Sequence, residues 1–270
     1  MDLEIRPLTA KIGAEVFGID LAAPSDHDID ELRKAWLDWK VLFFRDQAIT
    51  REQHIAFGRR FGDLEVHPFV EADERHPEIV VLNSDAERPI AASYWHSDVT
   101  WREEPSHGSI LRGVIIPPAG GDTLFADAAE AYKRLSDKWK ERVEGASAIH
   151  DYVRAFGADV SDDAKAETRA KYPPARHPVV RTHPETGAKS IYTNRVFTSH
   201  IEGMTPDESR DTINHLDRAI ADPSVQCRFR WQVDSFAMWD NRAVQHFATN
   251  DYHPEARRVE RVTIVGDRPF

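Results

Sequence analysis

Apolar residues recur along this chain with two different periods, which predict a mixture of helices and strands. Helical spacing predicts helices at residues 26–40, 49–62, 127–145 and 205–222. Alternating or continuous apolar runs predict strands at residues 41–45, 78–85 and 108–117, two strands within 177–194, and strand-rich segments at 225–241 and 257–267. Thr50, with Gln53 as its capping-box partner, and Thr205 are the predicted starts of two of these helices, and Gly62 is a predicted stop.

Short strands joined by turns and long excursions are typical of an antiparallel barrel or jelly roll with helices packed outside it. The chain has no repeat, no low-complexity tract and no Gly/Ser linker, and no shift in composition divides it. The sequence therefore predicts a single α+β domain over residues 1–270, with a jelly-roll (double-stranded β-helix) core and flanking helices.

Composition narrows the classes of function. The 270 residues are 41% hydrophobic and 30% charged, as in a soluble globular protein, and no apolar run approaches the roughly 20 residues that span a bilayer. The N-terminus is charged and does not resemble a signal peptide, and Cys227 is the only cysteine, so we expect a cytoplasmic protein without disulfides or a cysteine-based zinc site. The net charge of −11 argues against nucleic acid and anionic membranes as partners, and it means that an anionic substrate needs local arginines.

Six pairs of a histidine and an acidic residue two positions later are candidate metal-binding pairs: His76/Glu78, His96/Asp98, His183/Glu185, His200/Glu202, His215/Asp217 and His253/Glu255. Residues i and i+2 face the same way on a strand but lie about 200° apart on a helix, which excludes the pair at His215. His76, His183 and His253 begin His-Pro-Glu turns, where solvated loop residues are expected, and His200 is expected to face solvent. His96 and Asp98 alone lie in a β-prone aromatic segment.

His246 is the candidate third ligand, because it follows the turn after a predicted strand that ends at Trp239–Asn241. Two histidines and one carboxylate form the facial triad of non-haem Fe(II) oxygenases, which leaves coordination positions open. An ordinary loop histidine is the alternative reading of His246. A zinc hydrolase could use the same triad to activate water, and a non-catalytic jelly-roll binding module would need no triad.

Seven segments carry a more specific signal. They read, in chain order, "IGAEVFGIDL", "FFRDQAITREQHIAFGRRFG", "YWHSDVTW", "PPAGGDTLFADAAEAY", "HPVVRTHPETG", "MWDNRAVQHFATNDY" and "RRVERVTIVGDRPF". In this order the chain resembles, over nearly its full length, the Fe(II)/2-oxoglutarate-dependent taurine dioxygenase family, which includes alkylsulfatases and aryloxyalkanoate dioxygenases. The resemblance implies Fe(II), the co-substrate 2-oxoglutarate and O₂, and assembly into dimers or tetramers.

The resemblance also implies roles for single residues. His96, Asp98 and His246 fall on the iron ligands. Thr123 falls on the hydroxyl that bonds the distal carboxylate of 2-oxoglutarate, and Arg257 falls on the arginine that clamps it. The planar fork of an arginine suits a carboxylate, which agrees with this role. The implied reaction hydroxylates a substrate carbon and forms succinate and CO₂, and the product releases sulfite, sulfate or an alcohol when that carbon bears such a group.

The resemblance also bears on the substrate pocket. Arg261, an even number of residues beyond Arg257 on one strand, falls on an arginine that meets the anionic group of the substrate, and His67 matches a histidine that helps to hold a sulfonate. Val70 and Ala92 replace two polar residues on the amine side, so a buried ammonium would lack a partner there. This disfavours taurine itself and favours alkyl sulfates, alkanesulfonates or aryloxyalkanoates. Candidates to line an apolar tail, or to pack in the core, are Phe69, Tyr94 and Phe197.

Overall fold

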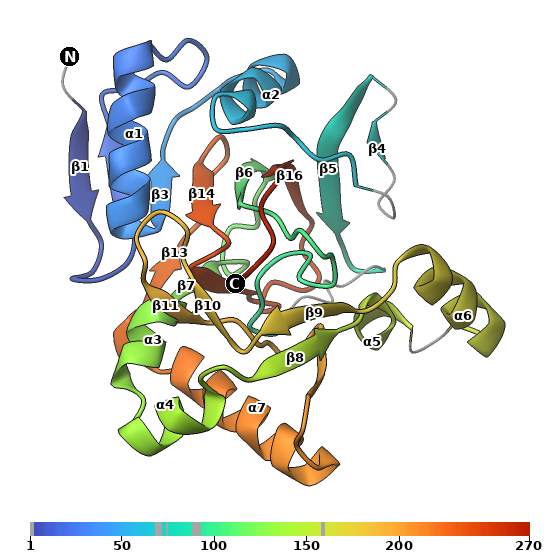
Figure 1. Cartoon of the computed structure of the whole chain (residues 1–270). Coiled ribbons are helices and arrows are strands. Elements are labelled where there is room, and N and C mark those ends of the chain that lie inside the picture. Colours follow the sequence, from blue (N-terminus) through green and yellow to red (C-terminus); the bar gives the residue numbers. More distant parts are fainter. Residues whose placement is uncertain (1–2, 68–71, 74, 88–92, 158–159) are drawn as a thin grey trace.

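An eight-stranded sheet organises the fold, which is known from a computed structural model that describes residues 3–67, 72–73, 75–87, 93–157 and 160–270 (Figure 1). The strand order is β1-β2-β3-β14-β6-β16-β5-β4; β2 and β3 pair in parallel, and the other described strand pairs of this sheet are antiparallel. The strands are β1 (Glu4–Pro7), β2 (Ala14–Phe17), β3 (Val41–Phe44), β4 (Ala72–Asp73), β5 (His76–Ser84), β6 (Gly108–Ile115), β14 (Phe236–Asp240) and β16 (Arg257–Ile264).

This large sheet is buried on both faces in its centre. In β3, Phe43 packs into one hydrophobic cluster and Phe44 packs into another, because successive side chains point to opposite faces of a strand. In β14, Trp239 and Met238 divide between the same two clusters. Burial on both faces explains why the sequence of β3 is continuously apolar rather than alternating.

A second sheet packs against one face of the large sheet. It consists of β13 (Gln226–Phe229), β7 (Thr123–Asp127) and β15 (Val244–Ala248), in that spatial order. The rings of Phe229 in β13 and Phe43 in β3 stack with their centroids 4.2 Å apart, and Phe125 of β7 joins the same cluster. The space between these two sheets is where the candidate site lies.

Helices cover the outer faces of both sheets (Figure 1). The cluster on the far face of the large sheet includes α1 (Asp26–Trp39) and α2 (Arg51–Arg59), and the cluster behind the second sheet includes α3 (Ala128–Arg134) and α7 (Pro206–Ile220). The predicted capping boxes at Thr50 and Thr205 are confirmed. The helix that starts after Thr50 ends at Arg59, three residues before the predicted stop at Gly62.

The remaining elements lie between and beside these layers. They are α4 (Asp137–Val143), α5 (Tyr152–Phe156), α6 (Asp162–Lys171), the 3₁₀ helix Pro223–Val225, the sheet of β12 (Thr198–Ile201), β8 (Ser147–His150) and β9 (Ala175–Pro178), and the hairpin of β10 (Val180–Thr182) and β11 (Lys189–Ile191). The hairpin confirms the two strands predicted within residues 177–194. Among the described residues, no helix has the length and apolarity needed to cross a membrane.

The helix predicted over residues 127–145 is wrong in one respect, because the segment forms two helices, α3 and α4. The break is at Leu135, whose backbone is extended (φ −59°, ψ 144°) and whose side chain is buried in the cluster behind the second sheet. Ser136 then takes the N-cap position of α4. Burial of one leucine outweighs the helical preference of its neighbours.

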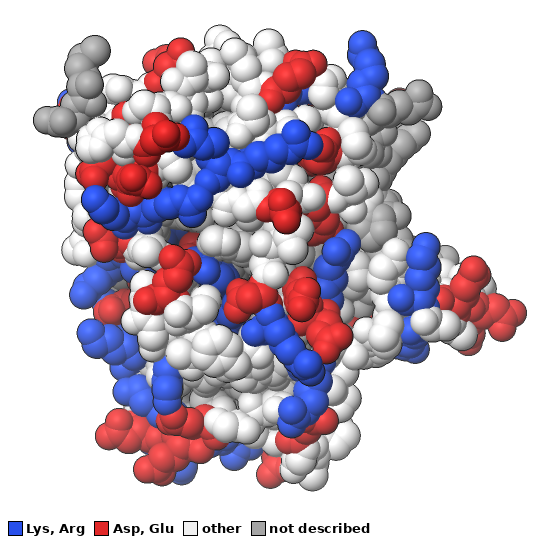
Figure 2. Space-filling view, turned by 45° about the horizontal axis from the view of Figure 1, so that its top comes forward, with Lys and Arg blue, Asp and Glu red and all other residues white. Residues whose placement is uncertain are grey.

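Charges of both signs are interspersed on the face of the molecule shown in Figure 2. The net charge of −11 is therefore not accompanied, on this face, by a broad basic surface that would attract an anion.

Candidate metal centre and pocket

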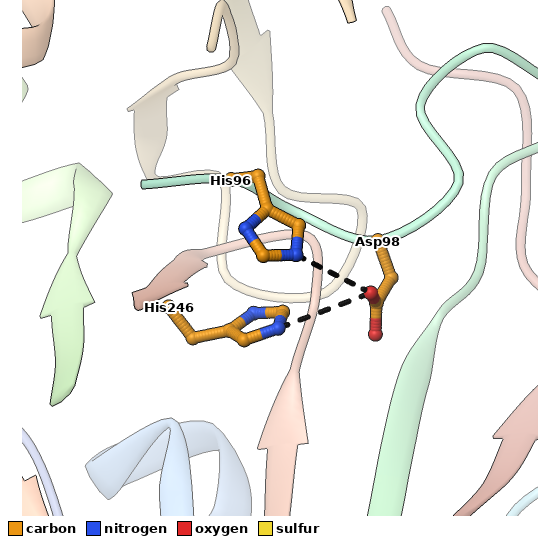
Figure 3. Close-up of side chains that lie close together, drawn as sticks. All are labelled: His96, Asp98 and His246. Atoms are coloured by element: carbon orange, nitrogen blue, oxygen red, sulfur yellow. Dashed lines mark ion pairs between the residues drawn. The ribbon is translucent and has the colours of Figure 1, made fainter. Parts of the chain in front are cut away.

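Three side chains that are distant in sequence converge between the two sheets. His96, Asp98 and His246 each offer one ligand atom, and these three atoms lie within 4.8 Å of one another (Figure 3). The Nε2 atoms of both imidazoles lie 3.9 Å from Oδ1 of Asp98, which is too far for a hydrogen bond. All three side chains are buried. The polar atoms therefore face one another without bonding, as the ligands of a shared ion do.

Hydrogen bonds to the other polar atom of His96 and of Asp98 leave His96 Nε2 and Asp98 Oδ1 available to a metal ion. Nδ1 of His96 lies 2.8 Å from the carbonyl oxygen of Tyr94 and must donate to it, so Nε2 of His96 keeps its lone pair. On Asp98, Oδ2 accepts hydrogen bonds from Ser109 Oγ (3.1 Å) and Arg261 Nη1 (2.7 Å), which leaves Oδ1 on the side of the imidazoles. Such partners behind the ligands are typical of metal sites, where they set the tautomer and the orientation of the ring.

The protonation states also suit a metal. Burial alone would raise the pKa of Asp98, but Arg261 and the two imidazoles outweigh burial and hold this pKa well below its usual range. Burial is the largest cause that lowers the pKa of His246, to about 3. An ionised carboxylate and a neutral imidazole are the forms that coordinate divalent ions. The donor set fits an iron ion, since imidazole and carboxylate both bind Fe(II).

His96, Asp98 and His246 line a cavity of about 860 Å³. Every other predicted site residue in the described part of the chain also lines this cavity. Among its lining residues are Thr123, Arg257, Arg261, His67, Phe197 and Tyr94. Phe69, Val70 and Ala92 lie outside the described residues.

The cavity wall includes the guanidinium of Arg257 and the hydroxyl of Thr123. Arg257, the first residue of β16, is 4% exposed, and its Nε donates to the carbonyl oxygen of Gly121 (3.1 Å). Within the described ranges no carboxylate lies within ion-pair distance of Arg257, and burial lowers the pKa of its guanidinium. Thr123 Oγ1 accepts a hydrogen bond from Trp231 Nε1 (2.9 Å), so its own proton can be donated into the cavity. A buried cation without a counter-ion is a ready site for an anion.

Arg261 lies further along β16 and belongs to the same cavity wall. Its Nη1 donates to Asp98 Oδ2, whereas its buried Nε has no hydrogen-bond partner in the part of the chain that the structure describes. Burial, then the positive charges of Arg261 and Arg102, lower the pKa of the nearby His67 to about 4. His67 is therefore neutral at pH 7.

Part of the cavity wall is aromatic. Phe197 is buried with Trp101 and Val99 in a small cluster and also lines the cavity. Tyr94 is 58% exposed and lines the cavity without packing in the core. Tyr152 of α5 packs edge-on against Trp101, with ring centroids 5.2 Å apart.

The other candidate pairs do not join this site. His215 lies in α7 and stacks on Trp139, while His200 and His253 are exposed. The expectation of a solvated loop is wrong for His183, which is 3% exposed and bonds through Nε2 to Asp240 Oδ2 (2.9 Å). The turn after His183 reaches solvent, but this side chain folds back onto the end of β14.

Ser109 and Trp231 are among the residues of the site that were not predicted from the sequence. Ser109, which bonds Asp98, lies beside the apolar residues Ile110 and Leu111 of β6, and a polar residue at a buried strand position was a usable signal. Trp231, which bonds Thr123 and lies under Arg257 (5.8 Å from the guanidinium carbon to the ring centroid), had no distinguishing signal.

Comparison with known proteins places the chain among dioxygenases. The alkylsulfatase of Acinetobacter baylyi is 35% identical over 98% of this chain and 86% of its own length. The (S)-phenoxypropionate/alpha-ketoglutarate-dioxygenase of Sphingobium herbicidovorans is 32% identical over 98% of this chain and 95% of its own. A crystal structure of a taurine dioxygenase from Burkholderia xenovorans superposes with a TM-score of 0.86 at 37% identity, covering 99% of this chain and 90% of that one.

The family model for "Taurine catabolism dioxygenase TauD, TfdA family" matches residues 4–263. This range contains all the predicted site residues and confirms the resemblance seen in the seven sequence segments. The chain belongs to the TauD, TfdA family of dioxygenases.

Proposed function

We propose that the protein is a 2-oxoglutarate-dependent dioxygenase that uses Fe(II) held by His96, Asp98 and His246. The observation that carries this proposal is the set of two imidazoles and one carboxylate that faces a cavity with two buried arginines. When bound, iron together with 2-oxoglutarate and O₂ supplies the oxidising power that turns a substrate C–H bond into C–OH, with release of succinate and CO₂.

Arg257 and Thr123 are proposed to hold the distal carboxylate of 2-oxoglutarate. The guanidinium of Arg257 keeps its two terminal nitrogens for a bidentate contact, because its hydrogen bond to Gly121 uses only Nε. The hydroxyl of Thr123 adds a donor, since Trp231 already fills an acceptor position on its oxygen. A zinc hydrolase with the same triad would have no use for this arrangement.

Arg261 and His67 are proposed to hold the anionic group of the substrate. Arg261 lies four residues beyond Arg257, roughly 13 Å along an extended strand, so the two anions can bind side by side along one wall. Asp98 is the only acidic residue among the described residues that line the cavity, and it is already engaged by Arg261. Among the described lining residues, the ammonium group of taurine would therefore lack a free counter-ion.

An apolar tail suits the rest of the cavity better. The aromatic side chains of Phe197, Trp101 and Tyr152 offer an apolar surface, which favours alkyl sulfates, alkanesulfonates or aryloxyalkanoates. Hydroxylation at the carbon that bears the sulfate, sulfonate or ether oxygen gives an unstable product, which collapses to an aldehyde or ketone. The relatives named as an alkylsulfatase and a phenoxypropionate dioxygenase support this class of substrate.

We also propose that the whole chain is one domain with a jelly-roll core. Support comes from the large sheet and the β13-β7-β15 sheet, which share a hydrophobic cluster, and from the length of the family match.

The decisive experiment measures succinate formed from 2-oxoglutarate with Fe(II), ascorbate and air, over a panel of alkyl sulfates, alkanesulfonates, aryloxyalkanoates and taurine. We expect succinate formation that at least one apolar anion stimulates more than taurine does, and none in His96→Ala. Consumption of a sulfate ester with zinc and without succinate would instead establish the hydrolase.

A further inference from the structure

Two segments far apart in sequence are joined side by side at the metal centre. The backbone N–H of His96 donates to the carbonyl of His246 (3.1 Å), and the N–H of His246 donates back to the carbonyl of His96 (2.8 Å). One residue further, Ser97 Oγ donates to the carbonyl of Val244 (2.8 Å). This ladder brings two of the predicted ligands into register.

The backbone ladder cannot continue to the third ligand, Asp98, because the chain turns immediately after it. Val99 has a φ of +48°, which is strained for a β-branched residue and persists only when its surroundings hold it. The opposite segment also turns, between β14 and β15. At this point the side chain of one residue, rather than the backbone, bonds the main chain of Asp98.

That side chain is Asn241, which is fully buried. Its Oδ1 accepts from the backbone N–H of Asp98 (2.7 Å), and its Nδ2 donates to the carbonyl of Asp98 (3.0 Å). A carboxamide presents the same donor and acceptor as a peptide group, so Asn241 extends the ladder by one step. Nδ2 also contacts Ser106, at the carbonyl (3.1 Å) and at Oγ (2.9 Å).

We propose that Asn241 is a positioning residue that fixes the main chain of Asp98 and so aims Oδ1 at the two imidazoles. The side chain of Asp98 is held at Oδ2 by Ser109 and Arg261, and Asn241 holds its backbone at both peptide groups. With both ends fixed, one orientation of Oδ1 remains. This inference rests on the proposed metal site and adds a residue that does not touch the metal.

The test is the dissociation constant for Mn(II), measured by calorimetry on the metal-free protein. Asn241→Ala is expected to weaken Mn(II) binding by about 10- to 100-fold, the usual effect of losing a partner behind a metal ligand. Ser106→Ala is the matched control. It removes one bond to Asn241 and leaves both bonds to Asp98, so Mn(II) affinity should stay at the wild-type value even if the melting temperature falls.

The outcomes separate this inference from the proposed function. If wild-type protein binds no Mn(II), the metal site itself fails. If wild-type protein binds Mn(II) and folded Asn241→Ala binds it equally well, only the role of Asn241 is overturned. Should Asn241→Ala not fold, Asn241→Asp keeps the size and one acceptor but loses the amide donor, and weaker binding is again expected. If neither variant folds while Ser106→Ala does, Asn241 serves folding and the proposal is wrong.

Discussion

Replacing Arg257 by methionine tests whether this buried arginine serves the co-substrate or the fold. Its side chain is nearly inaccessible and has no carboxylate partner among the described residues, so a bound anion would supply the negative charge that it lacks there. Truncating one partner of a buried charged pair costs about 2–5 kcal/mol. At about 1.4 kcal/mol per factor of ten, the apparent KM for 2-oxoglutarate should rise by about 30-fold to 4,000-fold.

In the absence of 2-oxoglutarate, Arg257→Met should change the thermal stability of the protein much less than it changes the KM. The substitution removes the hydrogen bond to Gly121, worth roughly 1.5–3 kcal/mol for a charged donor, but it also removes the cost of burying an unpaired guanidinium. These effects oppose each other, so we expect the melting temperature to change by only a few degrees.

The assay is succinate formation as a function of 2-oxoglutarate, together with thermal unfolding in its absence. Arg258→Met is the matched control, because Arg258 is the next residue of β16, pairs with Glu260 (2.9 Å) and does not line the cavity. An unchanged KM with a large fall in melting temperature in Arg257→Met would refute the reasoning and make Arg257 structural.

Three further predictions follow from the site. Arg261→Gln should impair turnover of anionic substrates while sparing 2-oxoglutarate binding, and its lost bond to Asp98 should also weaken Mn(II) binding; normal turnover would make Arg261 structural. Mn(II) at 100 times its dissociation constant should stabilise the wild-type protein by about 2.7 kcal/mol but should not stabilise Asp98→Ala, as measured by thermal unfolding with and without chelator. Burial lowers the pKa of His54 and His177 to about 4, so the unfolded chain binds more protons below pH 6.5. Stability of the metal-free protein should therefore fall from pH 6.5 to 4, by up to roughly 1.4 kcal/mol per pH unit for each histidine, and a constant urea midpoint would contradict this.

Local signals in the sequence predicted most elements because they act over a few residues. Thr50 and Thr205 start helices through bonds to backbone groups three residues away, and that spacing is visible in the sequence. Leu135 interrupts a segment of helical periodicity because its side chain is buried in a cluster built from distant residues. No local pattern records that cluster.

The same distinction holds at the candidate site. The types of residue that can bind a metal, and the similarity of their flanking segments to one family, are properties of the sequence alone, and they single out His96, Asp98 and His246. The partners of those residues are decided by the tertiary structure. Arg261 bonds Asp98 across 163 positions, and Asn241 holds the backbone of Asp98 across 143. Hydrogen bonds depend on distance in space, and only the packing of the two sheets brings these atoms within 3 Å of each other.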